Sequence, residues 1–311
     1  MLFPAPPGSE AILRHTADDA HLVSAGALQP ACASFFLPAR APTPRGAVLM
    51  LHGWTAGPWQ FTDLATLLSQ RGYHCYAARL PGHGAAAHDG SEDSSLLPRS
   101  AQASLFESCG TEAFAELQHL ATEHALPLYL VGFSAGGAMG LDLMQRFPDK
   151  VARAVLIAPM LRLKQRLPRA LFQALRWIPG SGFVADRIRM SWGPMPDPGP
   201  DGWRRPGHWT FRFGQLYALM LYTGQVHRRA TTLTVPTQFI VSEADDKVDE
   251  QAIFAFKRQA PDRHHVWCFP AADRVPHAML TAGENPDARS RAFVGELVHD
   301  FLSRGAGRDL P

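Results

Sequence analysis

The chain has 311 residues, of which 46% are hydrophobic and 19% are charged, and its formal net charge at pH 7 is +2. This length is sufficient for a large buried core, and the composition is that of an ordinary globular protein. The nearly balanced charge, without a basic stripe interleaved with aromatic residues, argues against a nucleic-acid partner.

The N-terminal stretch, to about residue 18, is expected to be a loose lead-in containing prolines. It has no apolar core typical of a signal peptide, and no stretch of the chain reaches about 18 consecutive apolar residues. We therefore expect a cytoplasmic protein with no membrane span. The four cysteines include no C-x-x-C pair, which favours free thiols over a metal site.

Short apolar runs then alternate with helical patterns as far as Pro159. Gly72 is expected to cap one helix, Gly110 to interrupt another, and Pro148 to end a third. This alternation is typical of a mostly parallel sheet covered by helices on both faces. The expected strands cover residues 21–24, 31–37, 46–51, 73–78, 128–131 and 151–157, and the expected helices cover residues 61–68, 101–125 and 137–147, with a polar loop at 85–100.

The alternation stops between residues 160 and 235, where we find helical and irregular pieces but no buried strand. One helix, expected over residues 211–226, is apolar nearly all round and therefore requires cover on more than one side. The simplest interpretation is a lid inserted over the strand ends. The sheet pattern resumes with strands at 236–241 and 265–269 and helices at 251–259 and 288–302. The fold class is thus α/β, with a core of residues 1–159 and 236–311 and a lid of residues 160–235.

A serine flanked by glycines lies between the strand at 128–131 and the following helix. The sequence Gly132-Phe133-Ser134-Ala135-Gly136 has the spacing of a nucleophile elbow, a sharp strand-to-helix turn that lifts a hydroxyl above the sheet. The helix N-terminus after the turn points free N–H groups toward whatever is attacked.

A serine hydroxyl requires a base to activate it and a carboxylate to orient that base. Asp245 follows the strand at 236–241, and His277 follows the last strand. Strand ends of a parallel sheet share one edge, so these side chains are expected to meet Ser134 there. Asp246 and Glu243, in the same loop, are alternative acids.

These residues resemble the α/β-hydrolases, nearest to the branch of carboxylesterases and monoacylglycerol lipases. The motifs that carry the resemblance span about residues 46–302: His52 to Gly57, Leu80 to Gly84, Gly132 to Gly137, Ser242 to Asp249, and His277. The resemblance implies Ser134 as nucleophile, Asp245 as acid and His277 as base, with the backbone N–H groups of Trp54 and Ala135 as the oxyanion hole. Two departures stand out: Ser242 where many relatives have glycine, and Ala278 where an acidic residue is common.

The expected activity is hydrolysis, through an acyl-enzyme, of a small or medium, largely apolar acyl or aryl ester. Phe133, Trp54 and Tyr217 are candidate pocket residues. The same triad also serves lysophospholipases, thioesterases and peptidases, and a non-catalytic ligand-binding protein of this fold is a further alternative. No cofactor or metal is expected. The expected partner is a small-molecule ester, and contact with a lipid substrate is compatible with this interpretation.

Overall fold

The computed structural model describes residues 5–164, 166–175, 177–178, 180–193, 204–230 and 233–304. Within them, seven strands form one sheet in the order β1-β3-β2-β4-β5-β8-β9. Edge strand β1 runs antiparallel to β3, whereas the other neighbouring pairs are parallel. The strands are β1 (Phe35–Leu37), β2 (Gly46–Leu51), β3 (Tyr73–Ala78), β4 (Leu128–Phe133), β5 (Arg153–Ile157), β8 (Thr237–Ser242) and β9 (His264–Phe269).

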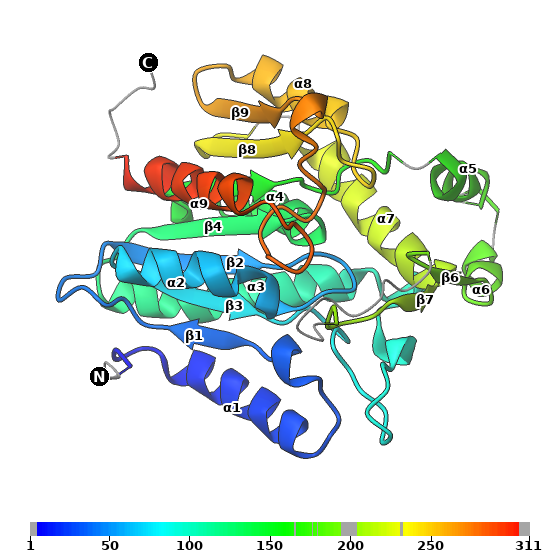
Figure 1. Cartoon of the computed structure of the whole chain (residues 1–311), viewed down its shortest axis with the longest axis horizontal. Coiled ribbons are helices and arrows are strands. Elements are labelled where there is room, and N and C mark those ends of the chain that lie inside the picture. The colour runs from blue at the N-terminus through cyan, green and yellow to red at the C-terminus, as the bar shows by residue number, and fades with distance from the viewer. Residues whose placement is uncertain are drawn as a thin grey trace.

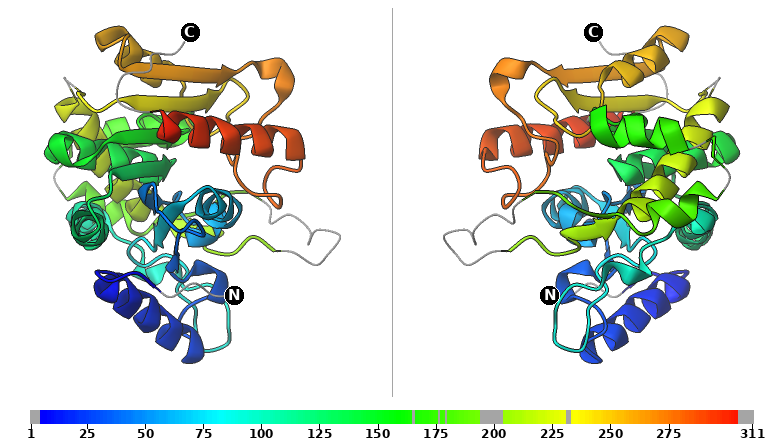
Figure 2. Two further views of the ribbon diagram at one scale, coloured as in Figure 1. Left: turned by 90° about the vertical axis from the view of Figure 1, so that its left-hand side faces the viewer. Right: turned by 90° about the vertical axis from the view of Figure 1, so that its right-hand side faces the viewer.

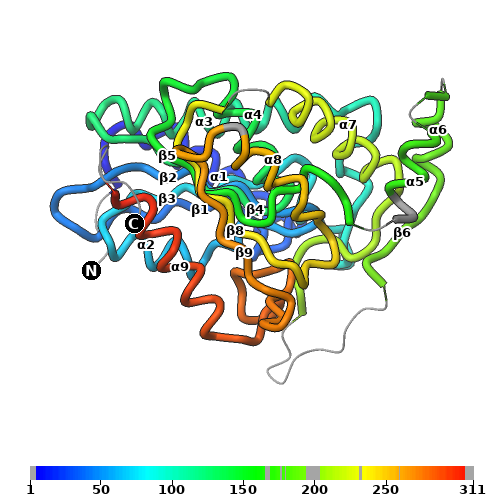
Figure 3. Tube along the Cα trace, turned by 90° about the horizontal axis from the view of Figure 1, so that it is seen from above, coloured from blue at the N-terminus to red at the C-terminus, as the bar shows by residue number. Residues whose placement is uncertain are grey.

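Helices cover both faces of this sheet (Figures 1 and 3). The helices α2 (Thr62–Gln70) and α9 (Ala288–Ser303) lie on one face, and α3 (Ser104–Glu123), α4 (Ala135–Arg146) and α8 (Gln251–Gln259) lie on the other. The period-two alternation of a strand divides β2 between the two resulting cores. Leu49 and Leu51 belong to the core under α3 and α4, while Val48 and Met50 belong to the core under α2.

The predicted α/β class is confirmed, but the N-terminal prediction is wrong. Residues expected as a loose lead-in and an edge strand form helix α1 (Glu10–Ser24), which lies beside β1 (Figure 1). Its anchors are two buried residues, Ile12 and Asp19. The Asp19 carboxylate forms an ion pair with the Arg79 guanidinium at 2.6 Å. Ile12 is the buried apolar side chain of α1, whereas Asp19 and His15 make polar contacts, so the apolar stripe of this helix is too short to stand out in the sequence.

Gly110 does not interrupt the helix expected over residues 101–125, because α3 runs continuously across it. The absent side chain has a packing role instead. A Cβ atom at Gly110 would lie 3.1 Å from the Met139 side chain of α4, so glycine lets the two helices approach closely. The sequence signal was real, but it marked a helix contact and not a break.

The segment between β5 and β8 contains α5 (Arg166–Leu175), α6 (Ser181–Ala185) and α7 (Phe213–Arg229), together with a small antiparallel pair, β6 (Arg189–Ser191) and β7 (Thr210–Arg212). This pair of strands was not expected. Because β7 includes residues 211 and 212, the helix expected over residues 211–226 begins at Phe213 instead. Helix α7 packs on α3 and α4, which supply the cover its apolar surface requires. Helices α5 and α6 project at one end (Figure 1), the end that faces the viewer in the right-hand view of Figure 2. Residues 165, 176, 179, 194–203 and 231–232 of the expected lid lie outside the described residues. Across the described ranges, no helix is both long and apolar enough to cross a membrane.

Candidate active site

Ser134 lies at the junction of β4 and α4 in a strained backbone conformation, with φ of 53°. A non-glycine residue in this left-handed region is uncommon and is maintained only by surrounding structure. The Ser134 N–H donates to Ile157 (2.9 Å), and its carbonyl accepts from Met160 (2.8 Å). The flanking glycine is required sterically, because a Cβ atom at Gly136 would overlap the carbonyl oxygen of Leu51.

The structure brings the two predicted partners of Ser134 to the same edge of the sheet. His277 Nε2 lies 3.0 Å from Ser134 Oγ, and His277 Nδ1 lies 2.6 Å from Asp245 Oδ2. The Asp245 and Ser134 residues are only 3% and 5% exposed, so solvent does not compete strongly for these contacts. This is the nucleophile, base and orienting-acid geometry of serine hydrolases.

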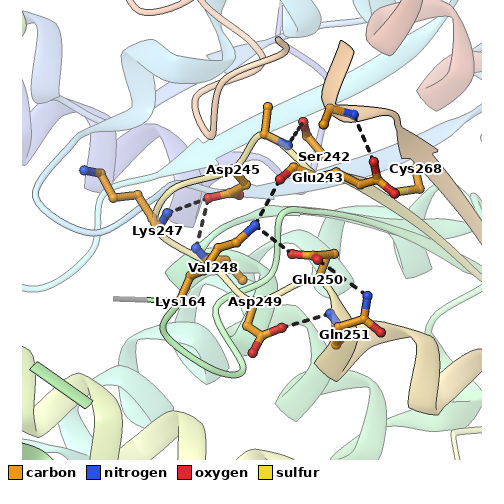
Figure 4. Close-up of polar contacts among 12 residues, drawn as sticks. Lys164, Ser242, Glu243, Asp245, Lys247, Val248, Asp249, Glu250, Gln251 and Cys268 are labelled. Atoms are coloured by element: carbon orange, nitrogen blue, oxygen red, sulfur yellow. Dashed lines mark hydrogen bonds and ion pairs between the residues drawn. The ribbon is translucent and has the colours of Figure 1, made fainter. Parts of the chain in front are cut away.

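The Asp245 carboxylate is held by its own loop (Figure 4). Its Oδ1 accepts from the backbone N–H groups of Lys247 (2.7 Å) and Val248 (2.9 Å). Burial alone would raise the pKa of this carboxyl, but the adjacent His277 and these hydrogen bonds outweigh burial and hold the pKa below its usual value. Asp245 is therefore a carboxylate at neutral pH.

The two alternative acids have other partners, although Asp246 also lines the cavity beside the triad. Asp246 is exposed and pairs with Lys247 at 2.8 Å, and Glu243 accepts the backbone N–H of Ala271 at 2.9 Å. Among the three candidates, the contact with His277 is made by Asp245.

The two predicted oxyanion donors follow the ends of two neighbouring parallel strands, β2 and β4. Ala135 is the first residue of α4, where helix N–H groups lack intrahelical partners, and Trp54 follows the end of β2. The next N–H of the helix, from Gly136, donates to the backbone carbonyl of His52 at 3.0 Å. This bond joins the loop after β2 to the turn that carries Ser134. His52 Nε2 accepts the N–H of Leu80 at 3.0 Å, so its other ring nitrogen carries the proton.

Ser134 and His277 open into a cavity of about 340 Å³. Trp54 and Phe133, two of the predicted pocket residues, line it. Tyr217 does not: it is buried against Phe172 and Phe213, with ring centroids 5.1 and 6.1 Å away. Tyr217 packs in the core beneath α7, so this part of the pocket prediction is corrected.

Several residues of the site carry no recognisable motif in the sequence. Ser242, noted only as a departure, donates its hydroxyl to the Val275 carbonyl (2.7 Å) and so joins the acid loop to the base loop. Gln60, Arg205 and Glu284 also line the cavity. They lie on three segments separated by long stretches of chain, and their proximity exists only in the folded structure.

Among the described residues, one group has metal-ligand atoms within 4.8 Å of one another, namely Glu296, His299 and Asp300 on α9. None of the three lines the cavity, and the two carboxylates are exposed groups of a kind common on protein surfaces.

Residues 42–194 match the sequence model of the family described as serine aminopeptidase, S33. A pimeloyl-(acyl-carrier protein) methyl ester esterase of Chromobacterium violaceum is 36% identical over 111 residues. That segment covers 36% of this chain and 36% of the relative, so the match spans about a third of the relative's length.

Solved structures extend the likeness over most of the chain. A soluble variant of monoglyceride lipase from Saccharomyces cerevisiae superposes with a TM-score of 0.66, at 15% identity over 87% of this chain and 91% of the other. The monoacylglycerol lipase of Paleococcus ferrophilus gives a TM-score of 0.62, at 18% identity over 87% and 98% of the two chains. At such identities the likeness is one of fold.

Proposed function

Because the chain belongs to the α/β-hydrolase family of serine hydrolases, we propose that it hydrolyses carboxylic esters through an acyl-enzyme formed on Ser134. The observation that carries this proposal is the continuous chain of contacts from Ser134 Oγ through His277 to Asp245, at 3.0 and 2.6 Å. The ionised Asp245 holds the imidazole so that Nδ1 keeps its proton and Nε2 is free to accept another.

In the proposed mechanism, His277 Nε2 accepts the hydroxyl proton as Ser134 Oγ attacks the ester carbonyl. The N–H groups of Trp54 and Ala135 bind the resulting oxyanion, and one such donor is worth about 3–4 kcal/mol in other enzymes. His277 then gives its proton to the leaving alkoxide, and the acyl group remains on Ser134. Water, deprotonated by His277, attacks the acyl-enzyme and releases the acid.

The proposed substrate is a small or medium ester with a largely apolar acyl or aryl group. The cavity of about 340 Å³ has an apolar wall that includes Trp54, Phe133 and Met160, which suits such a group. Residues 160–235 are proposed as a lid over this site, since Met160, Leu163 and Trp192 from that segment contribute to the wall.

A peptidase activity is the second candidate, because the matched family is described as a serine aminopeptidase. The same triad chemistry cleaves amides, so side-by-side assays of acyl p-nitrophenyl esters and aminoacyl p-nitroanilides discriminate the two activities.

Replacing Ser134 with alanine tests the mechanism itself. We expect S134A to lose p-nitrophenyl ester turnover to near the background rate, with an unchanged circular dichroism spectrum, because the nucleophile is removed without altering the backbone. A fluorophosphonate probe should label the parent protein and not the variant. Full turnover by folded S134A would exclude the proposed mechanism.

A further inference from the structure

The loop that carries Trp54 is held from both sides by side chains that line the cavity. On one side, the Gly53 N–H donates to Gln60 Oε1 at 2.9 Å. On the other side, the Thr55 carbonyl accepts from Arg205 Nη1 at 3.0 Å and from the His208 N–H at 2.8 Å. Trp54, whose N–H is a proposed oxyanion donor, lies between these two anchor points.

One carboxylate joins the two anchors. Glu284 Oε1 accepts from Arg205 Nε at 2.7 Å, and Glu284 Oε2 accepts from Gln60 Nε2 at 3.1 Å. The hydroxyl of Thr281 donates to the same Oε2 at 3.2 Å. The hydrogen bonds thus close a ring that leaves the loop at Gly53, passes through Gln60, Glu284 and Arg205, and returns at Thr55.

The ring is shielded from solvent, which makes its geometry restrictive. The Arg205 and Glu284 side chains are 14% and 13% exposed, and Gln60 is 3% exposed. Removing one partner of such a pair leaves the other charge poorly solvated, so the remaining side chains rearrange. Both ends of the Gln60 amide are engaged, and its orientation is therefore set by Glu284.

The ring also connects three parts of the chain that bear on the reaction. Arg205 belongs to the segment between β5 and β8, Gln60 follows the Trp54 loop, and Glu284 lies seven positions after His277. An ion pair that served only to attach the Arg205 segment would not require the amide of Gln60, or contacts on both neighbours of Trp54.

We propose that Glu284 is a positioning residue that, through Gln60 and Arg205, fixes the Trp54 N–H where the oxyanion develops. This inference rests on the proposed esterase function and assigns a role to a residue that touches neither the nucleophile nor the base. An oxyanion donor acts mainly in the transition state, so its misplacement lowers kcat and leaves KM nearly unchanged.

The test measures kcat and KM for p-nitrophenyl butyrate, with active sites counted by fluorophosphonate titration so that unfolded protein does not contribute. For E284Q we expect kcat to fall by about tenfold or more with KM within about twofold, because an amide N–H2 faces Gln60 Nε2 and breaks the ring. The exchange variant, Gln60→Glu with Glu284→Gln, restores every link: residue 60 accepts from Gly53 and from the new amide, whose oxygen accepts from Arg205. We expect it to recover kcat to within about threefold of the parent.

E296Q is the matched control, since it removes one partner of the Arg71–Glu296 pair, whose atoms are 3.1 Å apart and whose side chains are 44% and 49% exposed. Both kinetic constants should stay at the parent values. An unchanged kcat in E284Q, a loss confined to KM, or an exchange variant no better than E284Q would overturn the positioning role. A parent protein that neither turns over esters nor reacts with the probe would overturn the proposed function instead.

Discussion

The buried carboxyl of Asp245 keeps its charge because three donors surround it. Two backbone N–H groups bind Oδ1, and the His277 ring binds Oδ2. An amide at this position would still accept the backbone bonds but would offer an N–H2 group to the imidazole. The ring would then carry its proton on Nε2, which faces Ser134 and would no longer accept the hydroxyl proton.

D245N is therefore expected to lower kcat by about a thousandfold or more without unfolding the protein. D246N is the comparison variant: Asp246 lines the cavity but pairs with Lys247 and not with His277, so its replacement should leave kcat within about twofold of the parent, whatever its effect on KM. Steady-state kinetics with a p-nitrophenyl ester measures both. The acid would have to be reassigned if D246N lost activity and D245N kept it.

At the scale of elements, the buried Asp19 carboxylate is a main polar anchor of α1. Asp19 is 1% exposed, binds Arg79 and accepts the N–H of Ser34 at 2.8 Å. Burial would raise the pKa of Asp19, but the hydrogen bonds and charge of Arg79 dominate and lower it. The same carboxylate thus attaches the helix to Arg79, which directly follows β3, and to Ser34, which precedes β1.

D19N is expected to reduce the free energy of unfolding by about 2–3 kcal/mol, because it leaves the Arg79 charge without its partner in a largely buried site. Urea denaturation measures the change. D18N, at the neighbouring exposed position, should alter stability by less than about 0.5 kcal/mol. Equal stability of D19N and D18N would contradict the role assigned to this pair.

The elements with strong apolar patterns were predicted from the sequence, and those held by polar contacts were not. The strands at 46–51 and 73–78 match β2 and β3, since a strand buried on both faces is apolar throughout. Helix α1 was missed because it buries one apolar side chain, Ile12, and its other contacts include the polar pairs of Asp19 and His15. The β6–β7 pair was missed because its strands have three residues each.

For the whole molecule, buried histidines set the response to acid. Burial lowers the pKa of several imidazoles, to about 3 for His52 and about 4 for His74. The pKa is also lowered, first by burial, in His83, His208 and His264. His15 opposes this trend, because its hydrogen bond with Glu116 raises its pKa.

Stability is expected to fall as the pH decreases below about 6.5, where the unfolded histidines take up protons that the folded ones do not. Each such histidine lowers the free energy of unfolding by up to about 1.4 kcal/mol for each pH unit of acidification. For His52 this loss continues down to its folded pKa of about 3. Carboxylates with lowered pKa, such as Asp245, lose their contribution only below about pH 4. Urea unfolding at pH 7, 6 and 5 and constant ionic strength measures the effect. A free energy of unfolding that stays constant over this range would contradict it.

The sequence by itself determined the α/β class and placed Ser134, Asp245 and His277 as candidates, because each follows a recognisable apolar strand and strand ends of a parallel sheet converge. It did not decide which of Asp245, Asp246 and Glu243 is the triad acid, because all three lie in the loop that follows the same predicted strand. Only the tertiary structure decided that Tyr217 packs inside α7's core and that Gln60, Arg205 and Glu284 meet around the Trp54 loop. Those contacts join residues far apart in the chain, and such polar side chains carry no periodicity that reports their partners.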